Sequence, residues 1–197
     1  MMKTVVGSFD TYQDAARAAD ELRASGIADS EINVVGNNVT AKGDIRRDAA
    51  KDDGSNTATG AIAGGAIGGI AGAAAALAGL AIPGIGPILA AGPIAAALAG
   101  AGAGAVAGGL IGSLTEMGVP SEHAETYAEA VRRGGALVIV RTEDFKVERV
   151  EDIIQGQGAV DIAERAEQWR ESGWEGFNPR AKPYSWDQIE QERARYR

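Results

Sequence analysis

The chain has 197 residues, with 19 lysines and arginines against 27 aspartates and glutamates, which gives a formal net charge of -8. Nucleic acids require a cationic surface, so this balance excludes general nucleic-acid binding. The absence of cysteine excludes disulfides and thiolate chemistry. The N-terminus carries no basic segment followed by an apolar one, so we expect no secretory signal and synthesis in the cytoplasm.

The first 53 residues predict a β-α-β unit. Residues 4–9 are rich in β-forming side chains and predict a strand. Asp10 and Gln13 have the spacing of a capping box for an alanine-rich helix, which Gly26 would end. Residues 31–35 predict the second strand, and a polar linker follows over residues 36–56.

An uncharged segment follows, because residues 54–115 are 62 residues without one Asp, Glu, Lys or Arg. We predict an antiparallel helical hairpin here, with arms over residues 59–82 and 94–114. Prolines and glycines favour a turn between the arms, and the turn residues are Pro83, Gly84, Gly86 and Pro87. Each arm would be about 30 Å long, close to the thickness of the hydrocarbon core of a bilayer.

Glycine recurs in each predicted arm in unbroken steps of four residues. The first ladder is Gly60, Gly64, Gly68 and Gly72, and the second is Gly100, Gly104, Gly108 and Gly112. The two ladders are mirror-symmetric about Gly86, so an antiparallel hairpin folded there would bring them to matching heights. We therefore predict that these glycines are the helix-packing and oligomerisation residues.

Energetics require a packing partner for such helices. A helical glycine costs about 1 kcal/mol relative to alanine, so the 13 glycines of the arms impose a penalty on the order of ten kcal/mol. Close backbone approach between helices can offset that penalty. Three interpretations are open: the hairpin inserts in a lipid bilayer, it is buried in the shared core of a soluble homo-oligomer, or the segment is a disordered low-complexity linker. The lack of an aromatic belt between Tyr12 and Tyr127 counts against lipid.

Residues 116–162 predict the second half of the folded domain. Ser121 is the expected N-cap of a helix that ends at Gly134 and Gly135, and residues 136–140 form a near-continuous apolar run, typical of a central strand. An amphipathic helix over residues 147–154 and a short strand over residues 159–162 follow. Residues 1–53 and 116–162 together predict a ferredoxin-like α+β sandwich, split by the helical hairpin of residues 54–115.

A charged tail over residues 163–197 carries all three tryptophans, Trp169, Trp174 and Trp186. Ser185 and Gln188 have the spacing of a capping box for a final helix. Two interpretations are open: the tail lies across its own domain, or its tryptophans anchor on a neighbouring subunit.

No catalytic, cofactor-binding or metal-binding constellation is predicted. The glycines of residues 102–108 resemble a dinucleotide-binding loop, but they belong to the second ladder. His123 is the only histidine, so neither a catalytic triad nor a strong metal site follows from it. We expect a protein that is not an enzyme.

The chain resembles a bacterial general-stress-protein family of the heat- or low-temperature-induced type. The resemblance rests on residues 5–10, on the central glycine zipper and on residues 118–138, and it covers about residues 3–160. It implies a stress-associated role. With the ladders, this predicts a membrane-associated protein that self-assembles through its hairpin. The alternatives are a cytoplasmic homo-oligomer, or an α/β ligand-binding or regulatory module that the hairpin tethers.

Overall fold

The computed structural model describes residues 1–37, 39–40, 81–82, 85–92, 94, 109–182 and 184–196. The elements of the first half are β1 (Met2–Phe9), α1 (Tyr12–Ala24), the 3-10 turn η1 (Asp29–Glu31) and β2 (Ile32–Asn37). The uncharged segment contributes β3 (Ala81–Ile82), β4 (Gly86–Ala91) and most of α6 (Gly109–Glu116). The remaining elements are α7 (Ser121–Arg132), β5 (Ala136–Glu143), η2 (Asp144–Lys146), α8 (Val147–Gly156), α9 (Ile162–Glu171) and α10 (Trp186–Ala194).

The strands form one antiparallel sheet in the order β1-β5-β2-β4, and the two-residue β3 pairs with β4 at its far edge. β5 lies between β1 and β2, and Val138 is opposite Gly7 on one side and Val34 on the other. This central place agrees with the apolar run of residues 136–140, because a strand covered on both faces needs apolar side chains on both. The protein therefore has an α+β fold.

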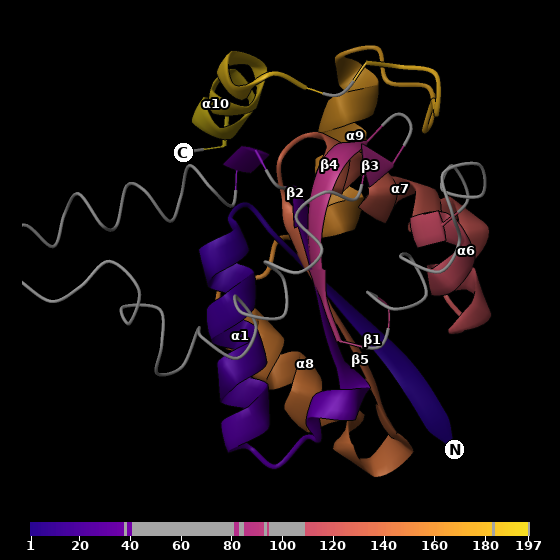
Figure 1. The fold of residues 1–197 in the computed structure, drawn as a ribbon, viewed down its shortest axis with the longest axis vertical. Helices are drawn as coiled ribbons and strands as arrows, with labels where there is room; N and C mark the ends of the chain where they lie inside the picture. The colour runs from indigo at the N-terminus through magenta and orange to yellow at the C-terminus, as the bar shows by residue number, and fades with distance from the viewer. Residues whose placement is uncertain are drawn as a thin grey trace, which may run out of the picture.

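Helices cover both faces of the sheet (Figure 1). The side chains of Val138 and Val140 pack with α1 and α8, while those of Leu137 and Ile139 pack with α6 and α7. This alternation along β5 is the two-residue period of a strand. α8 packs closely on β1, because a Cβ on Gly7 would lie 2.4 Å from the Ile154 side chain of α8.

Two predicted helix starts differ from the structure by one residue. Thr11, not Asp10, caps α1, and its hydroxyl accepts the Asp14 amide at 3.1 Å. Pro120 precedes α7, and Ser121 is the first helical residue. The capping box of Ser185 and Gln188 at α10 is confirmed.

The predicted helical hairpin is wrong where the structure describes its centre. Ala81 and Ile82, expected to end the first arm, lie in β3, and Gly86 begins β4 instead of forming a turn between helices. Prolines at 83, 87 and 93 cannot donate backbone hydrogen bonds in a helix. The segment instead joins the sheet, where Ala90 pairs with Val35. Within the predicted second arm, residues 109–114 are helical, as part of α6.

Of the last strand predicted over residues 159–162, the structure contains only a single antiparallel bridge between Val160 and Ser8. The reason is the capping chemistry of the next residue. The Asp161 carboxylate accepts the amides of Ala163 and Glu164 at 2.9 and 3.2 Å, so α9 begins at Ile162. An N-cap of this kind ends the extended backbone directly after Val160.

Candidate functional site

Seven of the eight ladder glycines lie outside the described residues, as do Pro83 and Gly84 of the predicted turn. Gly112 is the exception, and it lies in α6. A Cβ built on Gly112 would meet no atom of the described residues within 4 Å. Gly86 and Pro87 lie at the start of β4.

The uncharged segment is attached to the folded domain through one apolar cluster. Ile85, Ile88 and Ile94 are buried there. Leu110 and Leu114 of α6 belong to the same cluster. Its partners on the sheet and α7 are Val35, Leu137, Ile139, Ala124, Ala128 and Val131. The middle of the uncharged segment and its C-terminal end therefore pack on the same face of the sheet.

A buried asparagine fixes the exit from β4. The Asn33 side-chain oxygen accepts the backbone amide of Ile94 at 2.7 Å, and its side-chain nitrogen donates to the Ile139 carbonyl at 3.3 Å. Gly92 lies between the end of β4 and Ile94 in the chain, and its backbone has a φ of +88°. A Cβ on Gly92 would be 2.3 Å from the Ile32 carbonyl oxygen. Only glycine fits such a conformation and approach.

A second buried asparagine fixes the chain where it leaves β2. The Asn37 side chain donates to the Val131 carbonyl at 3.3 Å and accepts the Val39 amide at 2.9 Å. The Thr40 hydroxyl donates to the Asn37 carbonyl at 2.9 Å. The chain that leaves β2 is thus tied to the C-terminal end of α7 by Asn37, and the chain that leaves β4 is tied to the sheet by Asn33.

A buried ionic cluster, here called the tail cluster, joins the C-terminal tail to α7. It consists of Glu129, Arg132, Arg133, Trp169, Tyr184, Glu192 and Tyr196. The Glu129 carboxylate is fully buried and accepts from Arg132 at 2.8 Å and from Arg133 at 2.6 Å. Arg133 also donates to Glu192 of α10 at 2.6 Å. Buried charges require pairing of this kind.

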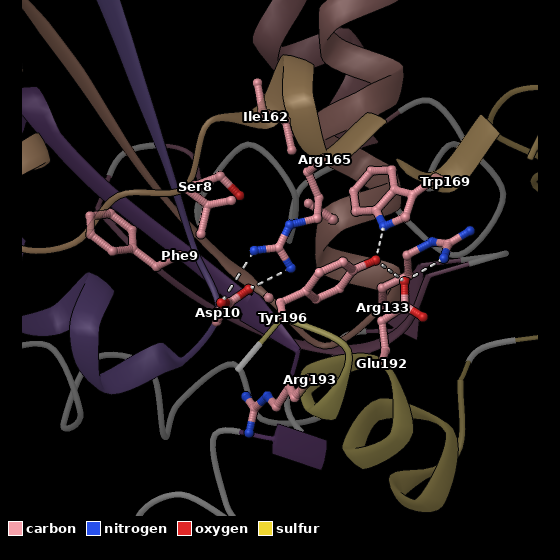
Figure 2. Close-up of a pocket in the computed structure, with 13 residues that line it drawn as sticks. Ser8, Phe9, Asp10, Arg133, Ile162, Arg165, Trp169, Glu192, Arg193 and Tyr196 are labelled. Carbon is pink, nitrogen blue, oxygen red and sulfur yellow. Dashed lines mark hydrogen bonds and ion pairs between the residues drawn. The ribbon is translucent and has the colours of Figure 1, made fainter. Parts of the chain in front are cut away.

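Aromatic rings of the tail complete the cluster around a cavity of about 30 Å³ (Figure 2). The Trp169 indole donates to the Tyr196 hydroxyl at 3.1 Å, and that hydroxyl donates to Glu192 at 3.0 Å. The Arg133 guanidinium lies 4.7 Å from the centre of the Trp169 ring. At the other side of the cavity, Arg165 covers the Tyr196 ring at 3.5 Å and pairs with Asp10 at 3.3 Å.

The electrostatics of the cluster favour the charged arginine. Burial alone would lower the pKa of the Arg133 guanidinium, but hydrogen bonds and charges from Glu129 and Glu192 raise it above its ordinary value. Burial, and then the Glu192 charge, raise the pKa of Tyr196, which therefore stays neutral and can donate its proton to Glu192.

The three tail tryptophans have different environments. Trp169 is 3% exposed and packs with Ala130 and Ala166 of its own chain, and Trp174 lies edge-on to it at 5.7 Å. Trp186 begins α10 and is half-buried. The tail thus lies across its own domain.

Beside this cluster, a polar hollow of about 370 Å³ lies between α9 and the end of α10. Asp161, Glu164, Gln168 and Arg195 line it. Within the described part of the chain, no group of three or more acidic, histidine or cysteine side chains could hold a metal ion. His123 is exposed on α7 and lies 3.8 Å from Glu122.

Sequence reasoning missed the tail cluster and the two asparagines. A signal existed for one part: Glu129 precedes Arg132 and Arg133 by three and four residues, the spacing of neighbours on a helix. No local pattern indicated Glu192, because its partner is 59 residues away in the chain. Asn33 and Asn37 interrupt an apolar strand, and a polar side chain at such a place indicates a buried hydrogen-bonding role.

The described elements form an α+β domain with helices on both faces of its sheet, and the glycine-rich uncharged segment lies between β2 and α7 in the sequence. Residues 4–81 match the family described as heat induced stress protein YflT domain, and residues 76–169 match a protein family of unknown function, DUF1269. Each match covers one half of the domain and one glycine ladder. The two matches support a bacterial stress-protein family, and the first supports a stress-associated role. No curated protein and no solved structure matches the chain.

Proposed function

We propose that this stress-associated protein is non-enzymatic and self-assembles through its two glycine ladders. The observation that carries the proposal is the pair of four-residue glycine ladders within an uncharged run of 62 residues. Helices with such ladders approach each other closely, and the contact between backbones offsets the conformational cost of glycine. The folded domain would display the ladders and hold them in place.

The attachment points of the ladder segments support this proposal. The first segment leaves β2 beside Asn37, and β3 follows it, while the second follows Ile94 and ends in α6. Each segment is therefore joined at both ends to elements of the folded domain. Attachment of this kind lowers the entropy that the ladders lose on packing. At Gly112 of α6, no atom of the described residues would lie within 4 Å of an added Cβ, which leaves room for a packing partner.

We also propose that the domain is ferredoxin-like, with β4 as an additional strand. Counting the Val160 bridge as a strand, the order is Val160, β1, β5, β2, with every pair antiparallel. α1 follows β1 and α8 follows β5, and both pack on the same face. The insertion then lies between the two β-α-β halves.

The environment of the ladders is the second part of the proposal, and we favour a membrane over a soluble core. The support is the uncharged run, which is longer than a domain of this size can cover. Helical backbone also meets the demand of lipid that every N–H and C=O be paired. In the part of the chain that the structure describes, no helix is long and apolar enough to cross a membrane.

Carbonate washing of a membrane fraction, followed by light scattering, tests both parts. We expect the protein to stay with the washed membranes and, in mild detergent, to have several times the 20.1 kDa mass of one chain. Complete release as a soluble high-mass particle would contradict the membrane and leave self-assembly standing. A monomer in both fractions would contradict the whole proposal.

Ligand binding by the domain is a second candidate function, favoured by the hollow between α9 and α10. Its 370 Å³ falls within the size range of small-molecule sites, and charged groups of both signs line it. A thermal-shift screen of polar metabolites tests it on the full chain. Stabilisation that Gln168→Ala abolishes would support binding, and a screen without any stabilising compound would contradict it.

A further inference from the structure

Among the described residues, no strand pairs with the outer edge of β1 along most of its length. β1 pairs with β5 over its whole length on one side, but on the other side only Ser8 is bridged, to Val160 at 2.7 Å. In an antiparallel pair, alternate residues direct both backbone groups to the same side. The Ser8 carbonyl faces Val160, so the N–H and C=O groups of Met2, Thr4 and Val6 face the same open edge.

Two side-chain hydrogen bonds reach the residues of this edge within the described part of the chain. The Thr4 hydroxyl donates to the Met117 carbonyl at 2.5 Å, so the Thr4 side chain is held on its own domain. The Tyr127 hydroxyl donates to the Val6 carbonyl at 3.4 Å, the long limit for a hydrogen bond. The backbone groups of Met2 and Thr4 that face outward have no hydrogen-bond partner among the described residues. Figure 1 shows β1 on the outside of the sheet. An edge of this kind is a template for another strand.

Apolar side chains gather at the start of the open edge. The exposed large apolar residues of the described chain are Met1, Met2 and Phe145, exposed by 99%, 49% and 77%. Met2 pairs with Glu143 at the end of β5, and the Met1 carbonyl accepts the Asp144 amide at 3.0 Å, so all three residues lie at the same end of the β1–β5 pair. Exposed apolar clusters beside an open edge indicate a protein contact.

We infer that the β1 edge pairs with the β1 edge of a second copy, antiparallel and about a twofold axis at Thr4. This inference rests on the proposed self-assembly. Thr4 would face Thr4 of the second copy, and Met2 would face Val6. The donors and acceptors that face outward then match in both directions, as twofold symmetry requires. The Met2 side chain would also cover Val6, which is half-buried in each chain.

Charge also favours a second copy. Side chains of odd-numbered β1 residues lie on the α8 side of the sheet, because Gly7 faces Ile154. Lys3 therefore lies on that side, at the edge. Exposed Glu148, Glu151 and Asp152 on α8 outnumber the exposed Arg149, so Lys3 of a second copy would approach an acidic helix. The approach is reciprocal under twofold symmetry.

The edge contact alone is small. A pairing of five residues buries much less than the roughly 800 Å² per partner of a stable complex. Copies already gathered by their glycine ladders would meet at a high effective concentration, which makes a weak contact effective. The edge would then set the orientation of neighbouring domains in the assembly.

Cysteine cross-linking tests the register directly, because the natural chain has no cysteine. In the full chain, Thr4→Cys would place two thiols about 5.5 Å apart in Cα separation, within disulfide range. Lys3→Cys is the matched control, since its own copy would be offset by two residues at about 8 Å, beyond that range. We expect Thr4→Cys to form disulfide dimers under mild oxidation at least about tenfold faster than Lys3→Cys.

Equal rates for the two variants, or a faster Lys3→Cys, would overturn the edge pairing. A mixture of Met2→Cys and Val6→Cys chains provides a second measurement if Thr4→Cys folds poorly, and it should give mainly mixed dimers. Light scattering on the same samples separates this inference from the proposed function. Assemblies of high mass without the Thr4 cross-link contradict the edge alone, and a monomer at all concentrations contradicts self-assembly.

Discussion

At the scale of single residues, two kinds of position support the fold. Gly36 and Gly134 leave room for neighbours: a Cβ on Gly36 would lie 2.6 Å from the Tyr12 ring, and one on Gly134 would lie 2.5 Å from Ile189. Asn33 and Asn37 place amides in an otherwise apolar strand and attach the chain on either side of it. These contacts join segments that are far apart in the sequence.

Gly134→Ala should destabilise the protein more than Gly118→Ala. Both glycines have left-handed backbones, with φ of +98° and +92°, so both variants lose about 1 kcal/mol to backbone strain. Of the two, only Gly134 is crowded, by Ile189 of α10 and by Thr40, while no described residue would lie within 4 Å of a Cβ on Gly118. Overpacking should add about 1–3 kcal/mol to the loss in the Gly134 variant. Urea denaturation measures both losses, and equal losses would contradict the close contact with α10.

Tyr12 makes the fold sensitive to alkali. Burial raises the pKa of its hydroxyl to about 12 from an ordinary value of 10.0, and the Arg23 charge lowers it by less. The folded state therefore favours the neutral phenol. Its contribution to stability is complete below pH 10 and is lost as the pH rises from 10 to 12, by up to about 3 kcal/mol.

We expect Tyr12→Phe to flatten the fall in stability between pH 10 and 12. The hydroxyl has no hydrogen-bond partner within the described chain, so its removal should change stability little at pH 8. Urea midpoints of wild type and variant across this pH range provide the measurement. Two parallel curves would show that Tyr12 does not titrate as its burial requires.

At the scale of elements, the helix and strand types of the charged flanks could be read from periodicity and caps. α1, β2, β5 and α8 match their predicted segments within a few residues, because each has its own apolar period and stop signal. β4 could not be read this way. Its sequence, Gly-Pro-Ile-Leu-Ala-Ala, is apolar without alternation, a composition that fits a helix or a buried strand, and only pairing with β2 decides between them.

The buried side chain of Ile189 holds α10 on the domain together with ionic and aromatic contacts. Glu192 takes part in two of these contacts, so its loss should loosen the helix. Glu192→Ala removes the acceptor of Arg133 and of the Tyr196 hydroxyl. Because Arg133 keeps its bond to Glu129, we expect a loss of about 2 kcal/mol, below the cost of a fully broken buried pair. Hydrogen exchange over residues 185–196 should accelerate.

Gln191→Ala is the matched control for that prediction, because Gln191 is the preceding residue on α10 and is exposed. It should leave exchange in α10 unchanged. If both variants exchange alike, the tail cluster does not hold α10 on the domain, and the tail would have to be attached by its apolar contacts alone.

At the scale of the whole molecule, the amino-acid composition indicated how the chain is divided into segments, but not how those segments pack on one another. The uncharged run marked the segment between the two halves of the domain, and the ladders are the basis for the packing residues that we propose. Neither could show that Ile85 and Ile88 enter the core of the domain, because that burial depends on the sheet face left open by α1 and α8. The tail cluster was likewise hidden, since its charges pair across 59 residues.

The mass of the assembly, measured by light scattering after size exclusion, tests self-assembly through the ladders most directly. Gly68→Leu combined with Gly104→Leu places a large side chain in each ladder, whereas Gly79→Leu with Gly102→Leu adds the same atoms outside both. Close helix approach cannot accommodate leucine at a ladder position. We predict that the ladder variant falls toward the 20.1 kDa of one chain while the control keeps the wild-type mass. An unchanged mass for the ladder variant would contradict the account.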